Sequence, residues 1–194
     1  GLFTKVAQIV AHVFDVDTGV ISCSATRTDK VPNTSATAAS AASDLNGMAA
    51  FNAAQEIKER MLNVAANQFN VDTDMVKFRD NRVYAGNESI TFCDLAEMSW
   101  LQRVSLSAAG FYKTPELSWD PKTLTGNPFY YFTYGACVSE VVVDTLTGEA
   151  RVLSADIIQD CGDSLNPAVD YGQIEGAFVQ GLGWLTMEEL VWDK

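Results

Sequence analysis

TAASAASDLNGMAAFNAAQEIKERMLNVAANQF, residues 37–69, forms the longest continuous pattern in the chain. Its apolar spacing predicts one long helix from about residue 38 to about residue 68. The first half carries many alanines and one glycine, Gly47, so this part of the helix can approach other backbone closely. The second half, residues 56–69, is amphipathic and predicts a face that packs on a core.

Shorter elements flank this helix on both sides. Apolar residues at helical spacing predict a helix over 3–14, and β-branched residues predict a strand over 19–26. The other expected elements are a hairpin at 75–92 turning near Asp80–Asn81, a helix at 93–103, a loop at 113–128, strands at 129–143 and 150–159 joined by a turn with Gly148, and a loop followed by a helix within 166–190.

This mixture contains no strict alternation of strand and helix. It predicts an α+β fold, in which long helices pack on a mixed, largely antiparallel sheet. A chain of 194 residues can build one sizeable core or two lobes, which we place at about 1–104 and 105–194. The chain starts at Gly1 inside an apolar pattern and stops at Lys194 after a strand-like segment, so we expect an internal fragment of a larger polypeptide.

The composition is that of a globular protein with an acidic surface. Hydrophobic residues make up 47% and charged residues 20%, and the formal net charge is −12. Such a charge argues against nucleic acid or an anionic membrane as partner, and the sequence contains neither a signal peptide nor a membrane-spanning apolar run. The four cysteines, Cys23, Cys93, Cys137 and Cys161, form no C-x-x-C pair, so we expect buried free thiols in a reducing, cytoplasmic compartment.

Two segments rich in small residues are candidates for ligand binding. The first, Thr37–Gly47, opens the long helix, where free backbone N–H groups bind anions and Ser40 and Ser43 add hydroxyls. The second, Gly172–Gly181, places several glycines in a helix at a cost of roughly 1 kcal/mol each relative to alanine. Gln173 and Glu175 lie among those glycines. From composition alone, tight packing without a ligand is the favoured explanation of both segments.

Other polar residues give weaker signals. A metal site would need several carboxylates to converge, and the spacing of Asp156, Asp160, Asp163 and Asp170 does not require it. His12, the single histidine, lies in a helical pattern and is interpreted as a structural residue. The sequence has no G-x-S-x-G elbow, P-loop or G-x-G-x-x-G, so it gives only weak support to a serine hydrolase, a phosphoryl-transfer enzyme or a dinucleotide-binding protein.

Five segments together resemble one known family. They are VPNTSATAASAASDLNG (31–47), SLSAAGFYKTP (105–115), GNPFYYFTYGA (126–136), SEVVVDTLTG (139–148) and SLNPAVDYGQIEGAFVQGLG (164–183). In this order they resemble the molybdenum-cofactor domain of xanthine dehydrogenases. No single segment is specific, but their joint occurrence is.

The resemblance implies a cofactor and its contacts. The family binds molybdenum on a pterin dithiolene, hydroxylates purines with oxygen from water, and passes electrons through 2Fe–2S clusters and FAD, held in other domains or subunits, to NAD⁺. The family's cofactor pattern falls on Ala38, Ala39, Ser40 and Ala41, with Ala39 against the molybdenum ligand sphere. Its cofactor-contacting glutamine falls on Gln173. The partners implied are the rest of the molybdenum domain, the iron–sulfur and FAD domains, and further copies of the enzyme.

Three features qualify this resemblance. Animal relatives carry a serine where this chain has Ala42, so Ser43 is the candidate for the displaced hydroxyl contact. Aldehyde oxidases, the alternative branch, tend to have Gly-Gly where this chain has Ala38-Ala39. The family's catalytic glutamate lies in a Gly-Glu-Pro-Pro segment that this sequence lacks, so we assign no catalytic residue and expect the isolated fragment to be inactive.

A non-catalytic assembly module is the alternative hypothesis, from a different class of function. It is suggested by loop 113–128 and by the aromatics Trp119, Tyr130 and Tyr131.

Overall fold

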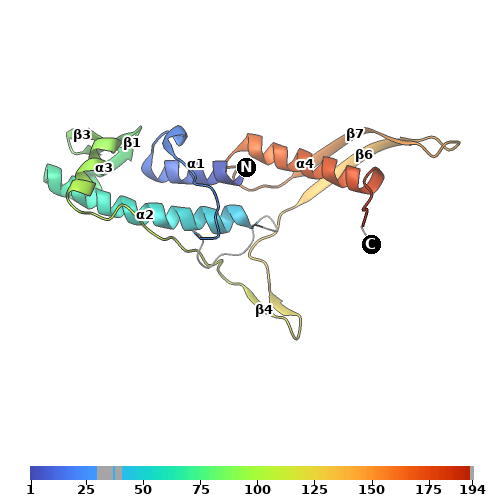
Figure 1. The fold of residues 1–194 in the computed structure, drawn as a ribbon, viewed down its shortest axis with the longest axis horizontal. Helices are drawn as coiled ribbons and strands as arrows, with labels where there is room; N and C mark the ends of the chain where they lie inside the picture. Colours follow the sequence, from blue (N-terminus) through green and yellow to red (C-terminus); the bar gives the residue numbers. More distant parts are fainter. Residues whose placement is uncertain (30–36, 38–40, 193–194) are drawn as a thin grey trace. The chain divides into compact units, whose positions relative to one another are not determined.

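A computed structural model describes residues 1–29, 37 and 41–192, and divides the chain into two compact units. Unit 1 comprises Gly1–Pro115 and unit 2 comprises Glu116–Lys194. Helices are combined with sheets whose strand pairs are all antiparallel in the described part of the chain, which confirms the α+β class (Figure 1). The expected lobe boundary near residue 104 stays a prediction.

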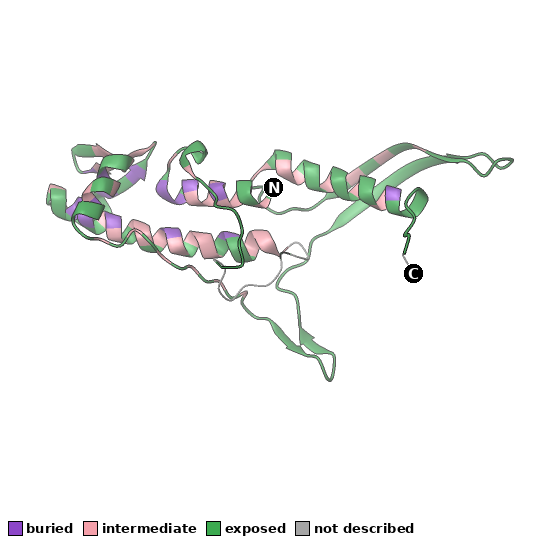
Figure 2. Ribbon diagram, in the orientation of Figure 1, coloured by how far each residue is buried: buried purple, intermediate pink, exposed green. Residues whose placement is uncertain are grey.

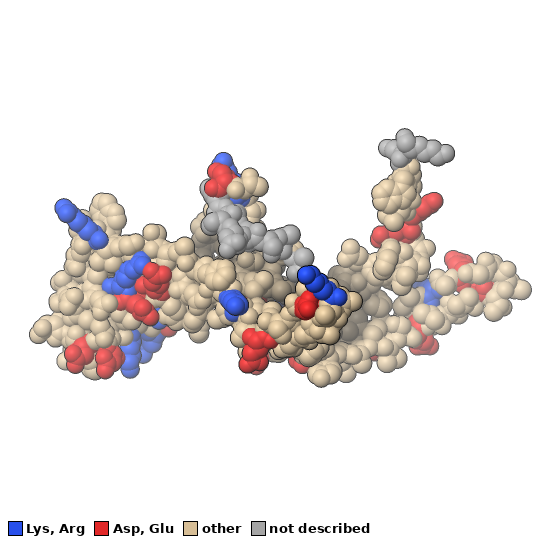
Figure 3. All heavy atoms as spheres, turned by 90° about the horizontal axis from the view of Figure 1, so that it is seen from below, with Lys and Arg blue, Asp and Glu red and all other residues tan. Residues whose placement is uncertain are grey.

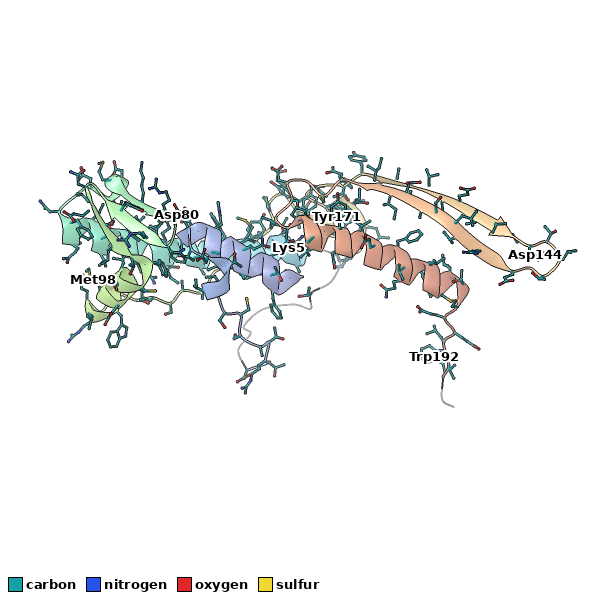
Figure 4. The ribbon with its side chains drawn as sticks, turned by 90° about the horizontal axis from the view of Figure 1, so that it is seen from above. Lys5, Asp80, Met98, Asp144, Tyr171 and Trp192 are labelled. Carbon is teal, nitrogen blue, oxygen red and sulfur yellow. The ribbon has the colours of Figure 1, made fainter. Side chains whose placement is uncertain are left out.

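Unit 1 is built around the predicted long helix. That helix, α2, runs over Ala42–Phe69, with α1 (Leu2–Phe14) alongside it (Figure 1). The other elements of this unit are η1 (Thr18–Val20), η2 (Thr73–Met75), β1 (Val76–Arg79), β2 (Arg82–Ala85), β3 (Glu88–Thr91) and α3 (Phe92–Leu101). The strands form one sheet in the order β1-β2-β3. Asp80 and Asn81 have φ of 50° and 62° and make the predicted turn between β1 and β2 (Figure 4).

The core of unit 1 lies where both helices meet the sheet and α3. The rings of Phe14, Phe78 and Phe92 pack against one another in tilted and edge-on arrangements, with centroids 5.3–6.3 Å apart. Buried positions in Figure 2 concentrate on these elements. The buried cluster consists of Val13, Phe14, Ala54, Met61, Val64, Ala65, Ala66, Val76, Phe78, Val83, Ala85 and Leu95. The amphipathic half of α2 therefore packs on the core, as its periodicity predicts.

After α3 the chain returns along α2 as an extended segment, residues 104–111, which we call the strap (Figure 1). Arg60 Nη1 donates to the carbonyl oxygens of Ser105 at 3.0 Å and Ser107 at 2.9 Å. Farther along, Asn52 Nδ2 donates to the Phe111 carbonyl oxygen at 2.8 Å. The strap thus runs antiparallel to α2, from its second half towards its first.

Unit 2 contains two hairpins and one helix. The first hairpin pairs β4 (Ser118–Asp120) with β5 (Thr125–Asn127), and the second pairs β6 (Gly135–Val143) with β7 (Ala150–Gln159). Asp144 lies at the tip of the longer hairpin (Figure 4), where its Oδ1 accepts from Leu146 N at 2.8 Å. This bond lowers the pKa of Asp144. Gly148 has φ of 77° and completes the predicted turn.

Unit 2 buries few of its apolar side chains. Strand β6 is exposed along its whole length, and β7 is half-buried only at Val152, Ala155 and Ile157 (Figure 2). Helix α4 (Pro167–Thr186) has a half-buried stripe at Ile174, Phe178 and Leu182, whose spacing of four places them on one face. Figure 3 shows acidic and basic side chains interspersed on one face of the molecule.

Several local predictions were wrong. Residues 19–26 form no strand, because a β-branched run needs a partner for its backbone groups and no described strand pairs with it. The predicted loop at 113–128 contains the β4–β5 hairpin, and the strand expected from 129 begins at Gly135. The sheet also gains a third strand, β3. All four cysteines are free but exposed, because Cys137 and Cys161 lie in the thinly packed unit 2 and Cys23 and Cys93 lie at the surface of unit 1.

The start of α3 gives a first testable prediction. Thr91 is its N-cap: Thr91 Oγ1 accepts from Asp94 N at 3.1 Å and donates to Asp94 Oδ2 at 2.6 Å. We expect Thr91→Ala to lower the free energy of unfolding by about 1 kcal/mol, since it removes the cap. Urea unfolding followed by circular dichroism measures the effect. Thr91→Ser keeps the hydroxyl and should retain most of the stability; an equal loss in both variants would assign the effect to the methyl group.

Candidate cofactor-binding site

The first candidate region is the start of α2. Ala41 is its N-cap, with φ of −83° and ψ of −3°, and forms no side-chain capping bond. The first turn carries Asp44, and Ser43 is half-buried beside it. Backbone N–H groups and the positive end of the helix dipole make such a start suited to anionic ligand oxygens. Ala38, Ala39 and Ser40 lie outside the described residues, so their predicted contacts stay predictions.

Packing explains the small residues that follow this first turn. A Cβ added at Gly47 would lie 2.8 Å from Ile9 Cδ1 of α1. On another face of α2, a Cβ added at Gly110 of the strap would lie 1.8 Å from the Ala49 carbonyl oxygen. The first half of α2 is therefore flanked by α1 and by the strap, where the sequence suggested a helix against a sheet. Sequence reasoning missed this strap, although the lone glycine of SLSAAGFYKTP is its signal.

The second candidate region is the start of α4. Asn166 is its N-cap, with Oδ1 accepting from Val169 N at 3.1 Å, and Pro167 occupies the first turn. Gln173 and Glu175 lie exposed in the next turn, near Tyr171 (Figure 4). Both side chains are thus available to a ligand.

The glycines of α4 do not pack within the described part of the chain. A Cβ added at Gly172, Gly176 or Gly181 would meet nothing within 4 Å there. Each glycine in a helix interior still costs roughly 1 kcal/mol relative to alanine. Close packing among the described residues therefore does not account for these three glycines. Gly183 differs, because a Cβ there would lie 2.9 Å from Glu188 Oε1.

Two of the acidic residues singled out from the sequence form local hydrogen bonds. Asp160 Oδ1 accepts from Gly162 N at 2.9 Å, and Asp170 accepts from the hydroxyl of Ser164. His12 is exposed in the last turn of α1. Among the described residues, no group of three or more histidine, cysteine, aspartate or glutamate side chains could hold a metal ion.

A cavity of about 420 Å³ lies at the carboxyl end of α2, the opposite end of that helix from the first candidate region. It is lined by Ala66, Asn67, Asn70, Val71, Asp72 and Met75.

None of the described helices combines the length and apolar character needed to cross a membrane. The predicted cofactor contacts that fall on described residues are Ala41, Ser43 and Gln173, whose side chains do not titrate near neutral pH. They can bind and orient a ligand, and they cannot act as its general base.

The whole chain, residues 1–194, matches the family model described as "Molybdopterin cofactor-binding domain". The chain belongs to this family. It is 47% identical over 192 residues to a xanthine dehydrogenase of Oryza sativa subsp. japonica and 45% identical over 190 residues to a xanthine dehydrogenase/oxidase of Mus musculus. These alignments cover 99% and 98% of this chain and 13% of each relative.

Solved structures show that the molybdopterin cofactor-binding domain fold is shared more widely. Quinoline 2-oxidoreductase from Pseudomonas putida 86 superposes with a TM-score of 0.73 at 21% identity, over 98% of this chain and 24% of that one. CO dehydrogenase from Oligotropha carboxidovorans superposes with a TM-score of 0.75 at 21% identity, over 98% and 23%. At this identity the similarity concerns the fold alone.

Proposed function

We propose that this chain forms one wall of the molybdenum–pterin site of a xanthine dehydrogenase-type enzyme that hydroxylates purines. The match of the entire chain to a molybdopterin cofactor-binding domain, with 47% identity to a xanthine dehydrogenase, carries this proposal. When bound, the cofactor would supply the metal centre at which an electron-poor carbon is hydroxylated. The complete enzyme would be a cytoplasmic oligomer with FAD and 2Fe–2S clusters in other domains or subunits.

The residues present fit a bulky anionic cofactor. The uncapped start of α2 at Ala41 offers backbone N–H groups, and Ser43 adds a hydroxyl. On α4, Gly172 and Gly176 face open space in the described part of the chain, beside the exposed amide of Gln173, so a ligand could contact the backbone there. In this proposal Ala38, Ala39, Ser40 and Ala41 contact the cofactor at the start of α2, with Ala39 beside the metal.

The chain's own contribution is binding and not proton transfer. Glu175, Glu188 and Glu189 are exposed, and we assign none of them as the base. Gln173 would orient the cofactor by donating from its amide. The isolated chain should bind little cofactor, because the binding energy and geometry need both walls of the site. It should turn over no purine, because the acid–base group has to come from elsewhere in the enzyme.

Replacing Gln173 in the complete enzyme tests the proposal. We expect Gln173→Ala to lower the molybdenum content per chain, or the rate of xanthine oxidation at full molybdenum content, by about 10-fold. Gln180→Ala is the matched control, since Gln180 is exposed on the same helix about 10 Å farther along. Wild-type enzyme without molybdenum would overturn the proposal, and equal losses in both variants would remove Gln173 from the site.

The preferred substrate of the complete enzyme is tested on the same preparation. Oxidation of xanthine in preference to an aromatic aldehyde supports the purine branch, and the reverse preference supports the aldehyde oxidase alternative.

The exposed aromatics of unit 2 favour a second candidate function, that of an assembly module. Trp119, Tyr130 and Tyr131 are 51%, 49% and 52% exposed. One molybdenum per chain with turnover would contradict a purely structural role.

A further inference from the structure

Helix α2 is held on two opposite faces by different partners. One face of α2 contacts the strap. The residues in contact recur at helical spacings of three, four and seven, and are Ala49, Asn52, Ala53 and Arg60. The opposite face of α2 points towards α1 and the core. Its residues also recur at helical spacing, here seven, four and three, and are Gly47, Ala54, Lys58 and Met61. The two stripes fix the helix from both sides.

The strap is attached most closely to the first half of α2. Gly110 lies so near this half that an added Cβ would be 1.8 Å from Ala49 O and 2.9 Å from Ala53 N. One residue later, Asn52 Nδ2 donates to Phe111 O at 2.8 Å. A backbone-to-backbone approach with an adjacent hydrogen bond fixes both the distance of the strap from the helix and its position along it.

This attachment lies close to the start of the helix. Ala42 is seven residues before Ala49, which corresponds to about 10 Å of helix. An α-helix transmits a shift along such a length almost undiminished, because its backbone hydrogen bonds resist bending. Any displacement of the helix at Ala49 and Asn52 therefore moves Ala41 and Ser43 by a similar amount.

We propose that Asn52 and Gly110 are positioning residues for the cofactor site: by fastening the strap to α2, they set where the first turn of α2 presents Ala41 and Ser43. The inference rests on the proposed function of that turn. Neither residue touches the cofactor in this proposal. Both act through α2, in the way that outer groups orient metal and cofactor ligands.

The test uses the complete enzyme with Asn52→Ala, and with Asn63→Ala as the matched control. Asn63 is an exposed asparagine of the same helix, and its Nδ2 donates to Glu59 O of its own helix at 2.9 Å. Molybdenum content per chain, the line shape of the molybdenum(V) electron paramagnetic resonance signal and the thermal midpoint are measured for both. The first two readouts report on the site, and the third reports on folding.

We expect Asn52→Ala to lower molybdenum content by about 10-fold, or to change the molybdenum(V) line shape, with a thermal midpoint close to that of Asn63→Ala. A normal molybdenum content and line shape in Asn52→Ala would overturn the positioning role and leave the proposed function intact. Wild-type enzyme without molybdenum would overturn both. A change of equal size in Asn63→Ala would also overturn the positioning role, since the Asn63 side chain bonds to Glu59 of its own helix.

Discussion

Gly110→Ala is expected to lower the free energy of unfolding of the chain by about 3 kcal/mol, the upper part of the usual range for overpacking. The added methyl group would lie 1.8 Å from the Ala49 carbonyl oxygen, which is backbone and cannot turn aside. The strap and α2 must therefore move apart. That movement also stretches the bond from Asn52 Nδ2 to Phe111 O, now 2.8 Å. Urea unfolding followed by circular dichroism measures the loss.

Gly19→Ala is the matched control for this methyl group. Gly19 also lies in unit 1, and an added Cβ there would meet nothing within 4 Å in the described part of the chain. Its backbone does not require positive φ, so the substitution should be neutral or stabilise by up to about 1 kcal/mol through the unfolded chain. Equal urea midpoints for the two variants would show that the strap is not packed on α2.

Lys58→Ala is expected to cost about 2–3 kcal/mol, the second largest effect. Lys58 Nζ donates to the Val13 carbonyl oxygen at 2.6 Å, in the last turn of α1, and lies 5.0 Å from the centre of the Phe78 ring. One side chain thus joins α1, α2 and β1. Truncation removes a charged hydrogen bond and the packing of the aliphatic stem. Lys77→Ala, at an exposed position of β1, should change stability by less than about 0.5 kcal/mol.

The same side chain predicts a dependence on pH. Burial lowers the pKa of Lys58 below its usual 10.5, and nearby Asp15 raises it by a smaller amount. A lysine with a lowered folded-state pKa binds fewer protons in the folded than in the unfolded chain between the two pKa values. The free energy of unfolding of the wild-type chain, relative to that of Lys58→Met, should therefore rise as the pH increases from the lowered pKa towards 10.5. A difference that falls or stays flat over this window, in urea titrations at several pH values, would contradict burial as the cause.

Local sequence patterns were sufficient to predict most of the helices and strands. Helix α2 was predicted because its apolar spacing persists over many turns, and the β1–β2 turn because Asp80 and Asn81 tolerate positive φ. The strand expected at 19–26 was wrong, since propensity cannot say whether a partner strand exists. The strap was missed because its contacts join residues as far apart as Asn52 and Phe111 and leave no periodicity in either segment.

The candidate site was less accessible to such reasoning. Composition favoured plain packing for the start of α2, and the structure shows that packing accounts for Gly47. The same explanation does not account for Gly172 and Gly176, which face open space in the described part of the chain. Assigning Gln173, Ala39 and Ser43 to a cofactor required the resemblance of ordered motifs, because small side chains have no chemistry that identifies a ligand.

The position of the strap in the sequence has a consequence for biosynthesis. Helix α2 ends at Phe69, and the chain reaches Phe111, which accepts from Asn52, only after the sheet and α3 have been made. Contacts between residues distant in sequence form late, because closing the intervening loop costs entropy. On the ribosome, α1, α2 and the sheet can therefore assemble while one face of α2 is still uncovered. We expect the start of α2 to settle last, so in the proposed function cofactor insertion would follow the completion of unit 1.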